Sequence, residues 1–164
     1  MLTIREAEYS DLNEILDIYN QGIIDKIATL EVEEKDMVYM TKWFTDRSEK
    51  YKILVADLNS QVVGWVALNP YSHRCAYLGV ADLSIYIDRN QRGKGIGKAL
   101  LSHIEKEAMK SQIHKIVLFT FPFNELGQGL YKSMGYREVG IFKEQGRIDN
   151  RYVDVMAMEK ILPN

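Results

Sequence analysis

Three glycines at every second position lie among three basic residues near the middle of the chain, in the run Arg92-Gly-Lys-Gly-Ile-Gly-Lys98. Residues 81–87, before this run, alternate between apolar and polar and predict a strand, whereas apolar side chains four apart from Ile96 to Ala108 predict a helix. A glycine-rich turn between a strand and a helix exposes the first amides of the helix, where the helix dipole is positive. We therefore expect this turn to bind phosphate, the alternative being an ordinary structural connection. The residues expected to contact that ligand are Arg92, Gly93, Lys94, Gly95, Ile96, Gly97 and Lys98.

Two common phosphate-binding motifs do not fit this run. A Walker A loop requires glycine at position 92 and serine or threonine at position 99, where this chain has Arg92 and Ala99. The dinucleotide pattern G-x-G-x-x-G fails as well, because its third glycine would fall on Lys98 or Leu100. The ligand is therefore expected to be neither a nucleoside triphosphate held by a Walker loop nor a nicotinamide or flavin dinucleotide.

The pattern that does fit is Arg92-x-x-Gly95-x-Gly97, preceded by Ser-Ile-Tyr-Ile and followed by Gly-Lys-Ala-Leu-Leu. This stretch resembles the pyrophosphate loop of the GNAT superfamily of N-acetyltransferases, which bind acetyl-coenzyme A (acetyl-CoA). The resemblance implies that the chain is an acetyl-CoA-dependent N-acetyltransferase, with acetyl-CoA as its co-substrate.

Asn124 and Tyr131 lie seven residues apart in a predicted helix, so they share one side of it, about 10 Å apart along the axis. The resemblance implies that Asn124 hydrogen-bonds to the cofactor and that the Tyr131 phenol protonates the departing thiolate as general acid. Ser133 is a further candidate cofactor contact. The alternatives are that Asn124 is only a helix cap and Tyr131 only a core residue. Gly127 and Gly129 weaken this helix, and we expect them to leave room for the cofactor arm.

Asp82 lies on the polar face of the predicted strand 81–87. An amine arrives as an ammonium ion and must lose a proton before it attacks a thioester, and a carboxylate in a partly dehydrated cleft accepts that proton directly or through water. Similar sequences usually have glutamate here, so the shorter Asp82 favours a water relay. The alternative is a solvated carboxylate at a strand end. The backbone amides of Ile85, Tyr86 and Ile87 are expected to hold the thioester carbonyl.

Further motifs resemble the phosphinothricin and methionine-sulfoximine acetyltransferases over nearly the whole chain, which implies a small amino-acid-like acceptor and a homodimer. These motifs include Ile18-Tyr19-Asn20, Thr29-Leu30-Glu31, Trp43-Phe44, Pro70-Tyr71 through Ala76-Tyr77, and Gly146-Arg147 through Asp154-Val155. Two departures lie where the acid group of the acceptor should dock: Ser72 replaces a usual arginine, with Arg74 the nearest cation, and Tyr152 replaces a usual tryptophan. The expected acceptor contacts are Tyr19, Leu30, Glu31, Ser72, His73, Arg74, Asp82, Leu83 and Ser84.

Other functions remain open at this point. A peptide N-terminus or a polyamine is the alternative acceptor, and a polyamine would favour an acidic cleft such as Glu31, Glu33 and Glu34 provide. A non-catalytic acyl-CoA-binding module is the alternative from another class, and the presence of both Asp82 and Tyr131 argues against it.

The overall composition excludes several classes of partner. The chain has 164 residues, 21 basic against 23 acidic, with a net charge of −2, so no broad positive field favours nucleic acid or a membrane surface. The single cysteine, Cys75, fits a reducing compartment, and no apolar run approaches the ~20 residues of a membrane span, so we expect a cytoplasmic protein. The three histidines show no metal-ligand spacing, and no metal is expected.

The elements expected to position these residues form one domain over residues 1–164. The expected strands cover 2–7, 52–58, 61–68, 81–87, 115–121, 136–143 and 152–159, and the expected helices 12–23, 37–47, 96–108 and 124–134, with a polar loop over 144–151. This order predicts an α+β fold, sandwich-like, with a mixed, mostly antiparallel twisted sheet of about seven strands and about four helices on both faces. The resemblance adds a splay between strands 81–87 and 115–121 that admits the pantetheine arm.

Overall fold

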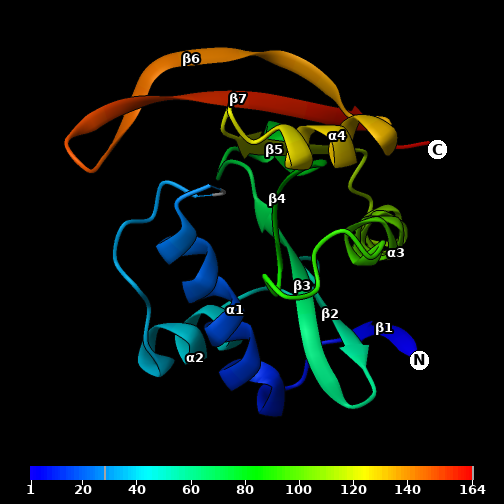
Figure 1. Cartoon of the computed structure of the whole chain (residues 1–164). Helices are drawn as coiled ribbons and strands as arrows, with labels where there is room; N and C mark the ends of the chain where they lie inside the picture. Colours follow the sequence, from blue (N-terminus) through cyan, green and yellow to red (C-terminus); the bar gives the residue numbers. More distant parts are fainter. Residues whose placement is uncertain (28, 164) are drawn as a thin grey trace.

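A seven-stranded sheet with helices on both faces makes up the fold in a computed structural model that describes residues 1–27 and 29–163 (Figure 1). In spatial order the strands are β1 (Leu2–Glu6), β2 (Ile53–Leu58), β3 (Gln61–Pro70), β4 (Val80–Ile87), β5 (Lys115–Thr120), β7 (Arg151–Ile161) and β6 (Arg137–Ile148). The helices are α1 (Leu12–Asp25), α2 (Met37–Thr45), α3 (Ile96–Lys110) and α4 (Glu125–Ser133), with short 3₁₀ turns at Tyr9–Asp11 and Cys75–Tyr77. The predicted fold class is confirmed.

The period-two alternation of the central strands divides the core between the two faces. On β3, Val66 and Leu68 belong to the apolar cluster beneath α3, and α4 packs on that same cluster. Trp65 and Ala67, one residue out of phase, belong to the cluster beneath α1 and α2. Both faces of the sheet are therefore covered, which is why its central strands are apolar on both sides.

The two parallel strands β4 and β5 separate soon after they meet. Their register pairs Val80 with Lys115, Ala81 with Ile116 and Asp82 with Val117. Beyond Asp82, β4 continues to Ile87 and β5 to Thr120 without further pairing between them. This is the expected splay, and it opens a gap in the middle of the sheet.

The expected polar loop over 144–151 is wrong, because β6 runs on to Ile148 and β7 begins at Arg151. Only Asp149 and Asn150 form the turn, with φ of 50° and 61°, a conformation that Asn and Asp tolerate in two-residue hairpins. The strand β6 lies at the edge of the sheet and is largely exposed, so its polar residues resemble those of a loop. The pair β6–β7 forms a long arm across the top of Figure 1.

Candidate active site

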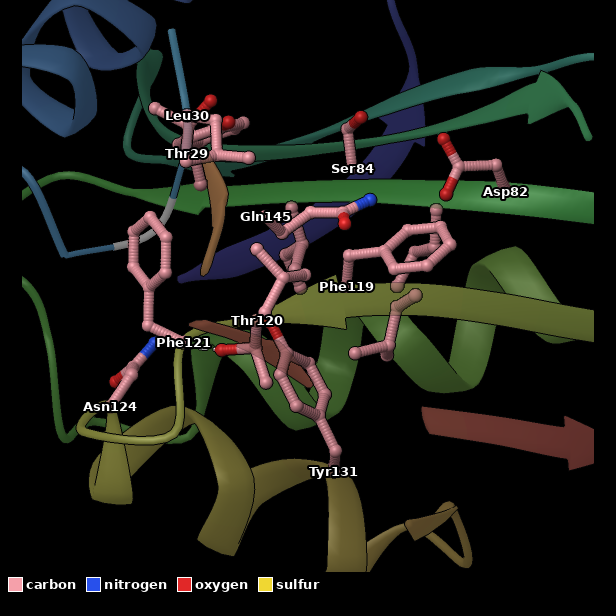
Figure 2. Close-up of a pocket in the computed structure, with 15 residues that line it drawn as sticks. Thr29, Leu30, Asp82, Ser84, Phe119, Thr120, Phe121, Asn124, Tyr131 and Gln145 are labelled. Carbon is pink, nitrogen blue, oxygen red and sulfur yellow. Dashed lines mark hydrogen bonds between the residues drawn. The ribbon is translucent and has the colours of Figure 1, made fainter. Parts of the chain in front are cut away.

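The gap between β4 and β5 contains a cavity of about 350 Å³, which we call the splay cavity (Figure 2). Residues from β4, β5, α4, the segment before α2 and the β6–β7 arm enclose it. They are Thr29, Leu30, Asp82, Leu83, Ser84, Ile85, Tyr86, Leu118, Phe119, Thr120, Phe121, Asn124, Tyr131, Gln145 and Val155.

A second, larger space of about 570 Å³ lies between the glycine-rich turn and α4, and we call it the loop groove. It is lined by Gly22, Ile27, Ile85, Tyr86, Ile87, Gln91, Arg92, Gly93, Gly95, Ile96, Gly97, Lys98, Asn124, Glu125, Leu126, Gly127, Gly129, Leu130, Tyr131 and Ser133. Ile85, Tyr86, Asn124 and Tyr131 line both spaces. A molecule lying in the loop groove therefore reaches the splay cavity past these side chains.

The glycine-rich turn has the backbone that a phosphate cradle needs. Gly93 and Gly95 have φ of 78° and 82°, and a Cβ at either position would meet no atom within 4 Å, so the turn is open to a ligand. Gly95 caps α3, whose first hydrogen bond runs from the Ala99 amide to the Gly95 carbonyl at 3.2 Å. The amides of residues 96–98 precede that bond and remain available to an anion. The turn thus fits the diphosphate of coenzyme A.

The cations around this turn are not equivalent. Arg92 donates to the Asp25 carboxylate at the end of α1 (3.3 Å), and Arg89 donates to the other oxygen of Asp25 (3.0 Å). Lys94, which was expected among the ligand contacts, donates to Gln91 instead and is not among the lining residues of the groove. The positive charge that faces the groove therefore comes from Arg92 and Lys98, with Arg92 partly compensated by Asp25.

The other glycines of this region serve different purposes. A Cβ on Gly97 would lie 2.7 Å from Leu130, so this glycine allows α4 to approach α3. A Cβ on Gly127 would lie 2.6 Å from the Asn124 amide, so the expected room for a cofactor arm there is taken up by Asn124. Of the two α4 glycines, Gly129 is the one whose Cβ would meet open space in the groove, as was expected of both.

Asn124 caps the N-terminus of α4, which was the alternative to a role as a cofactor contact. Its Oδ1 accepts a hydrogen bond from the Gly127 amide (3.1 Å), and its Nδ2 donates to the Thr120 hydroxyl (3.3 Å). The same side chain lines both the splay cavity and the loop groove. Capping thus holds a polar side chain at the junction of the two spaces.

Asp82 and Ser84 lie on the same side of β4 and border the splay cavity (Figure 2). Burial raises the pKa of the Asp82 carboxyl to about 6, although the Leu83 amide opposes the shift. The Asn69 side chain on β3 donates to the Ser84 hydroxyl oxygen at 3.1 Å. At neutral pH Asp82 is therefore mostly ionised yet basic enough to accept a proton.

Tyr131 projects from α4 toward the cavity between β4 and β5 (Figure 2). Burial raises the pKa of its phenol well above the usual value, and the neighbouring Tyr86 adds to the shift. Burial also raises the pKa of Tyr86 to about 12. Both phenols are therefore protonated at neutral pH, and Tyr131 is able to donate a proton.

The remaining predicted residues divide between the two spaces and the surface. Leu30, Leu83 and Ser84 line the splay cavity, and Ser133 lines the groove while its hydroxyl donates to the Leu130 carbonyl. Tyr19 is buried and packs against the rings of Trp65 and Tyr86. Outside the splay cavity lie Glu31, which pairs with Lys35 at 2.9 Å, the half-buried Ser72, and the exposed His73 and Arg74.

Several lining residues had no signal in the sequence. Phe119 and Thr120 come from the end of β5 and Phe121 follows it directly; the apolar pattern there predicts a strand but not which side chains face a gap. Gln145 comes from the segment expected to be a loop. In the described part of the chain, no group of three or more histidine, cysteine or carboxylate side chains is arranged to hold a metal. Nor do the described residues include a helix long and apolar enough to cross a membrane.

Comparison with known proteins gives a consistent result. Residues 12–136 match the model of the acetyltransferase (GNAT) family. YwnH of Bacillus subtilis (strain 168) is 31% identical over 162 residues, 98% of this chain and 99% of that protein. The L-methionine sulfoximine/L-methionine sulfone acetyltransferase of Pseudomonas aeruginosa is 29% identical over 159 residues, 96% of this chain and 92% of the relative. A solved phosphinothricin acetyltransferase from Sinorhizobium meliloti, in complex with acetyl-CoA, superposes with a TM-score of 0.92 at 27% identity, covering 98% of this chain and 88% of that one.

Proposed function

Because this chain belongs to the acetyltransferase (GNAT) family and uses acetyl-CoA as its co-substrate, we propose that it acetylates the amine of a small amino-acid-like acceptor. Relatives named for methionine sulfoximine and for phosphinothricin, each similar over nearly the whole chain, support an acceptor of this kind. The amine attacks the thioester directly in a ternary complex, without an acetyl-enzyme intermediate.

The observation that carries this proposal is the meeting of the two spaces at Tyr131. Asp82 and Tyr131 border one cavity, and Tyr131 also borders the groove that leads to the glycine-rich turn. Asp82 takes the proton that the ammonium group must lose, directly or through water. As the new C–N bond forms and the C–S bond breaks, Tyr131 gives its phenolic proton to the sulfur. The amides of residues 85–87 hold the carbonyl oxygen, which gains negative charge during the attack.

The roles of the other lining residues follow from the same arrangement. The turn at Arg92 to Lys98 holds the diphosphate, and Asn124 and Ser133 contact the arm that runs along α4. Leu30, Leu83 and Ser84 contact the acceptor.

The protein acts as a homodimer in the cytoplasm. The resemblance to the phosphinothricin acetyltransferases supports the dimer, and the exposed apolar side chains of β6, Val139, Ile141 and Phe142, offer a surface for a second copy. The free, exposed Cys75 suits a reducing compartment. Light scattering coupled to size-exclusion chromatography measures the mass in solution, and a monomer at micromolar concentration would contradict the dimer.

The activity is tested by following the release of free coenzyme A thiol. Acetyl-CoA is incubated with phosphinothricin, methionine sulfoximine, spermidine and short peptides in turn, and mass spectrometry then identifies the acetylated product. We expect thiol release with an amino-acid-like amine and a product heavier by one acetyl group. Calorimetric binding of coenzyme A without thiol release from any amine would identify the chain as a binding module instead.

A further inference from the structure

Few charged side chains line the splay cavity. Among the fifteen described residues around the cavity, Asp82 carries the one carboxylate, and no arginine, lysine or histidine is present. The cation expected to receive an acid group, Arg74, is exposed and lies outside this set, and Ser72 occupies the usual arginine position. The cavity is therefore anionic on one side and otherwise uncharged.

This distribution suits an amine but not a free carboxylate beside it. The ammonium group of the acceptor pairs with Asp82. A carboxylate on the adjacent carbon would enter the same cavity, repelled by Asp82 and without a cation to compensate its loss of hydration. An amide in the same place has no charge to desolvate, and it both donates and accepts hydrogen bonds.

Gln145 supplies a side chain that complements an amide. On the β6–β7 arm, Phe142 pairs with Val155 and Gly146 with Val153, so residues 143–145 bulge opposite the single residue Asp154. Glu144 has a φ of 51°, and its amide donates to the Asp154 carboxylate at 2.8 Å, which fixes the bulge. Bulges of this kind redirect a side chain, and here Gln145 enters the splay cavity (Figure 2).

The bulge is held over the cavity by contacts on its other side. A Cβ on Gly146 would lie 2.6 Å from the Leu30 side chain, so the glycine lets the arm approach the segment before α2. The turn of the arm is bound to the end of α1 by the ion pair between Lys26 and Asp149 at 2.7 Å. Gln145 is thus positioned by the fold and does not depend on a flexible loop.

Ser84 offers a second uncharged group. Its oxygen accepts a hydrogen bond from Asn69, whose own carbonyl oxygen accepts one from Arg47 at 3.3 Å. This chain fixes the orientation of the Asn69 amide and leaves the Ser84 hydrogen free to be donated. Arg47 itself donates to the backbone carbonyls of Trp43, Tyr51 and Leu68 and is not among the lining residues of the cavity.

We propose that Gln145 and Ser84 recognise an uncharged amide beside the reacting amine, so that this enzyme acetylates α-amino amides in preference to free amino acids. Gln145 is then a specificity-determining residue, and the acceptor is an amino-acid amide or the first residue of a peptide. The proposal rests on the acetyltransferase activity proposed above and narrows its acceptor.

The test compares matched acceptors in the thiol-release assay. L-Leucine, L-leucinamide and leucyl-glycinamide share one side chain and differ in the group beside the amine, and the last two distinguish a small amide from a peptide. Because a neighbouring carboxylate raises the pKa of the amine, kcat/KM is expressed per concentration of free base and measured at two pH values. We expect kcat/KM for at least one of the two amides to exceed that for leucine by about tenfold or more.

A charge introduced at position 145 provides the second readout. Gln145→Arg is expected to lower the ratio of amide to acid by about tenfold while the affinity for coenzyme A stays the same, because it adds the missing cation. Gln61→Arg, on the exposed start of β3, adds the same charge outside the cavity and should leave the ratio unchanged. This proposal alone is overturned if kcat/KM for leucine equals or exceeds that for both amides. It is also overturned if Gln145→Arg does not change the ratio of amide to acid. No thiol release with any amine overturns the proposed function together with it.

Discussion

Asp82 is the last residue of β4 that pairs with β5, and Tyr131 reaches from α4 into the gap that opens beyond it. A carboxylate and a phenol from different elements thus border one cavity. Burial raises the pKa of both groups, with opposite consequences at neutral pH: the carboxyl is close to its titration range, and the phenol stays protonated. The splay of the sheet therefore brings a base and an acid together.

Replacing Tyr131 with phenylalanine removes the proposed acid without changing the shape of the cavity. Tyr131→Phe should lower kcat by about 10²-fold, since general acid catalysis contributes about that much or more. The dissociation constant of coenzyme A, measured by calorimetry, should change little. Undiminished turnover would exclude Tyr131 as the acid.

Replacing Asp82 with asparagine removes the proposed base. In the wild type, kcat/KM should rise with pH through an apparent pKa near 6, because the carboxylate must be ionised to accept a proton. Asp82→Asn should lower the plateau by about 10²-fold and abolish this limb of the profile. A variant that keeps the same limb would show that another group titrates there.

Asp82→Asn should also stabilise the folded protein, although it lowers the activity. The pKa of Asp82 is raised from 3.8 to about 6 in the folded state, so folding favours the protonated form. The contribution of Asp82 is therefore most favourable below pH 4 and is lost as pH rises through 6. Above pH 6, Asp82→Asn should exceed the wild type by about 2 to 3 kcal/mol in free energy of unfolding, and near pH 4 the two should converge. Urea titrations at both pH values measure the difference.

The sequence predicts the central strands and the helices of this fold better than the strand at the edge of the sheet. Strand β3 is a continuous apolar run because each of its faces packs against a different layer, and the motif around Gly95 marks the turn into α3. In contrast, the second half of β6, residues 144–148, lies on an edge and is mostly polar, so no apolar pattern distinguishes it from a loop. Because a loop was expected over 144–151, Gln145 was not predicted as a site residue. The direction of its side chain depends on a bulge opposite Asp154, which only the pairing register reveals.

The roles of individual glycines also could not be predicted from sequence. Gly93, Gly97 and Gly127 look alike in the chain, yet the first has a positive φ, the second contacts α4 and the third contacts its own cap. Similarly, nothing in the sequence indicates that Arg92 shares Asp25 with Arg89, since α1 meets the turn only in the folded chain.

The pairing of Arg92 with Asp25 predicts that two substitutions differ in their effect on the affinity for coenzyme A. Arg92→Ala should raise the dissociation constant of coenzyme A by about tenfold, because it removes a charged donor to the diphosphate. Asp25→Asn removes the carboxylate that competes with that ligand, so affinity should stay the same or increase. Calorimetry at low salt measures both. An equal loss of affinity in the two variants would mean that Asp25 positions Arg92 instead of competing for it.

Two glycines in α4 provide a matched pair, because the same substitution should stabilise the protein at one position and not at the other. At Gly129 a methyl group meets open space, and alanine is the better helix former, so Gly129→Ala should raise the free energy of unfolding by up to about 1 kcal/mol. At Gly127 the methyl group would lie 2.6 Å from the Asn124 side-chain amide and displace the cap, which offsets the same gain, so Gly127→Ala should leave the free energy of unfolding unchanged or lower it by up to about 1 kcal/mol.

Binding distinguishes the two positions further. Gly129 borders the loop groove where nothing else fills the space, so its alanine variant should bind coenzyme A more weakly although it is more stable. Urea unfolding and calorimetry on the same preparations separate the two effects. If Gly129→Ala were more stable with unchanged affinity for coenzyme A, the cofactor arm would not pass this side of α4.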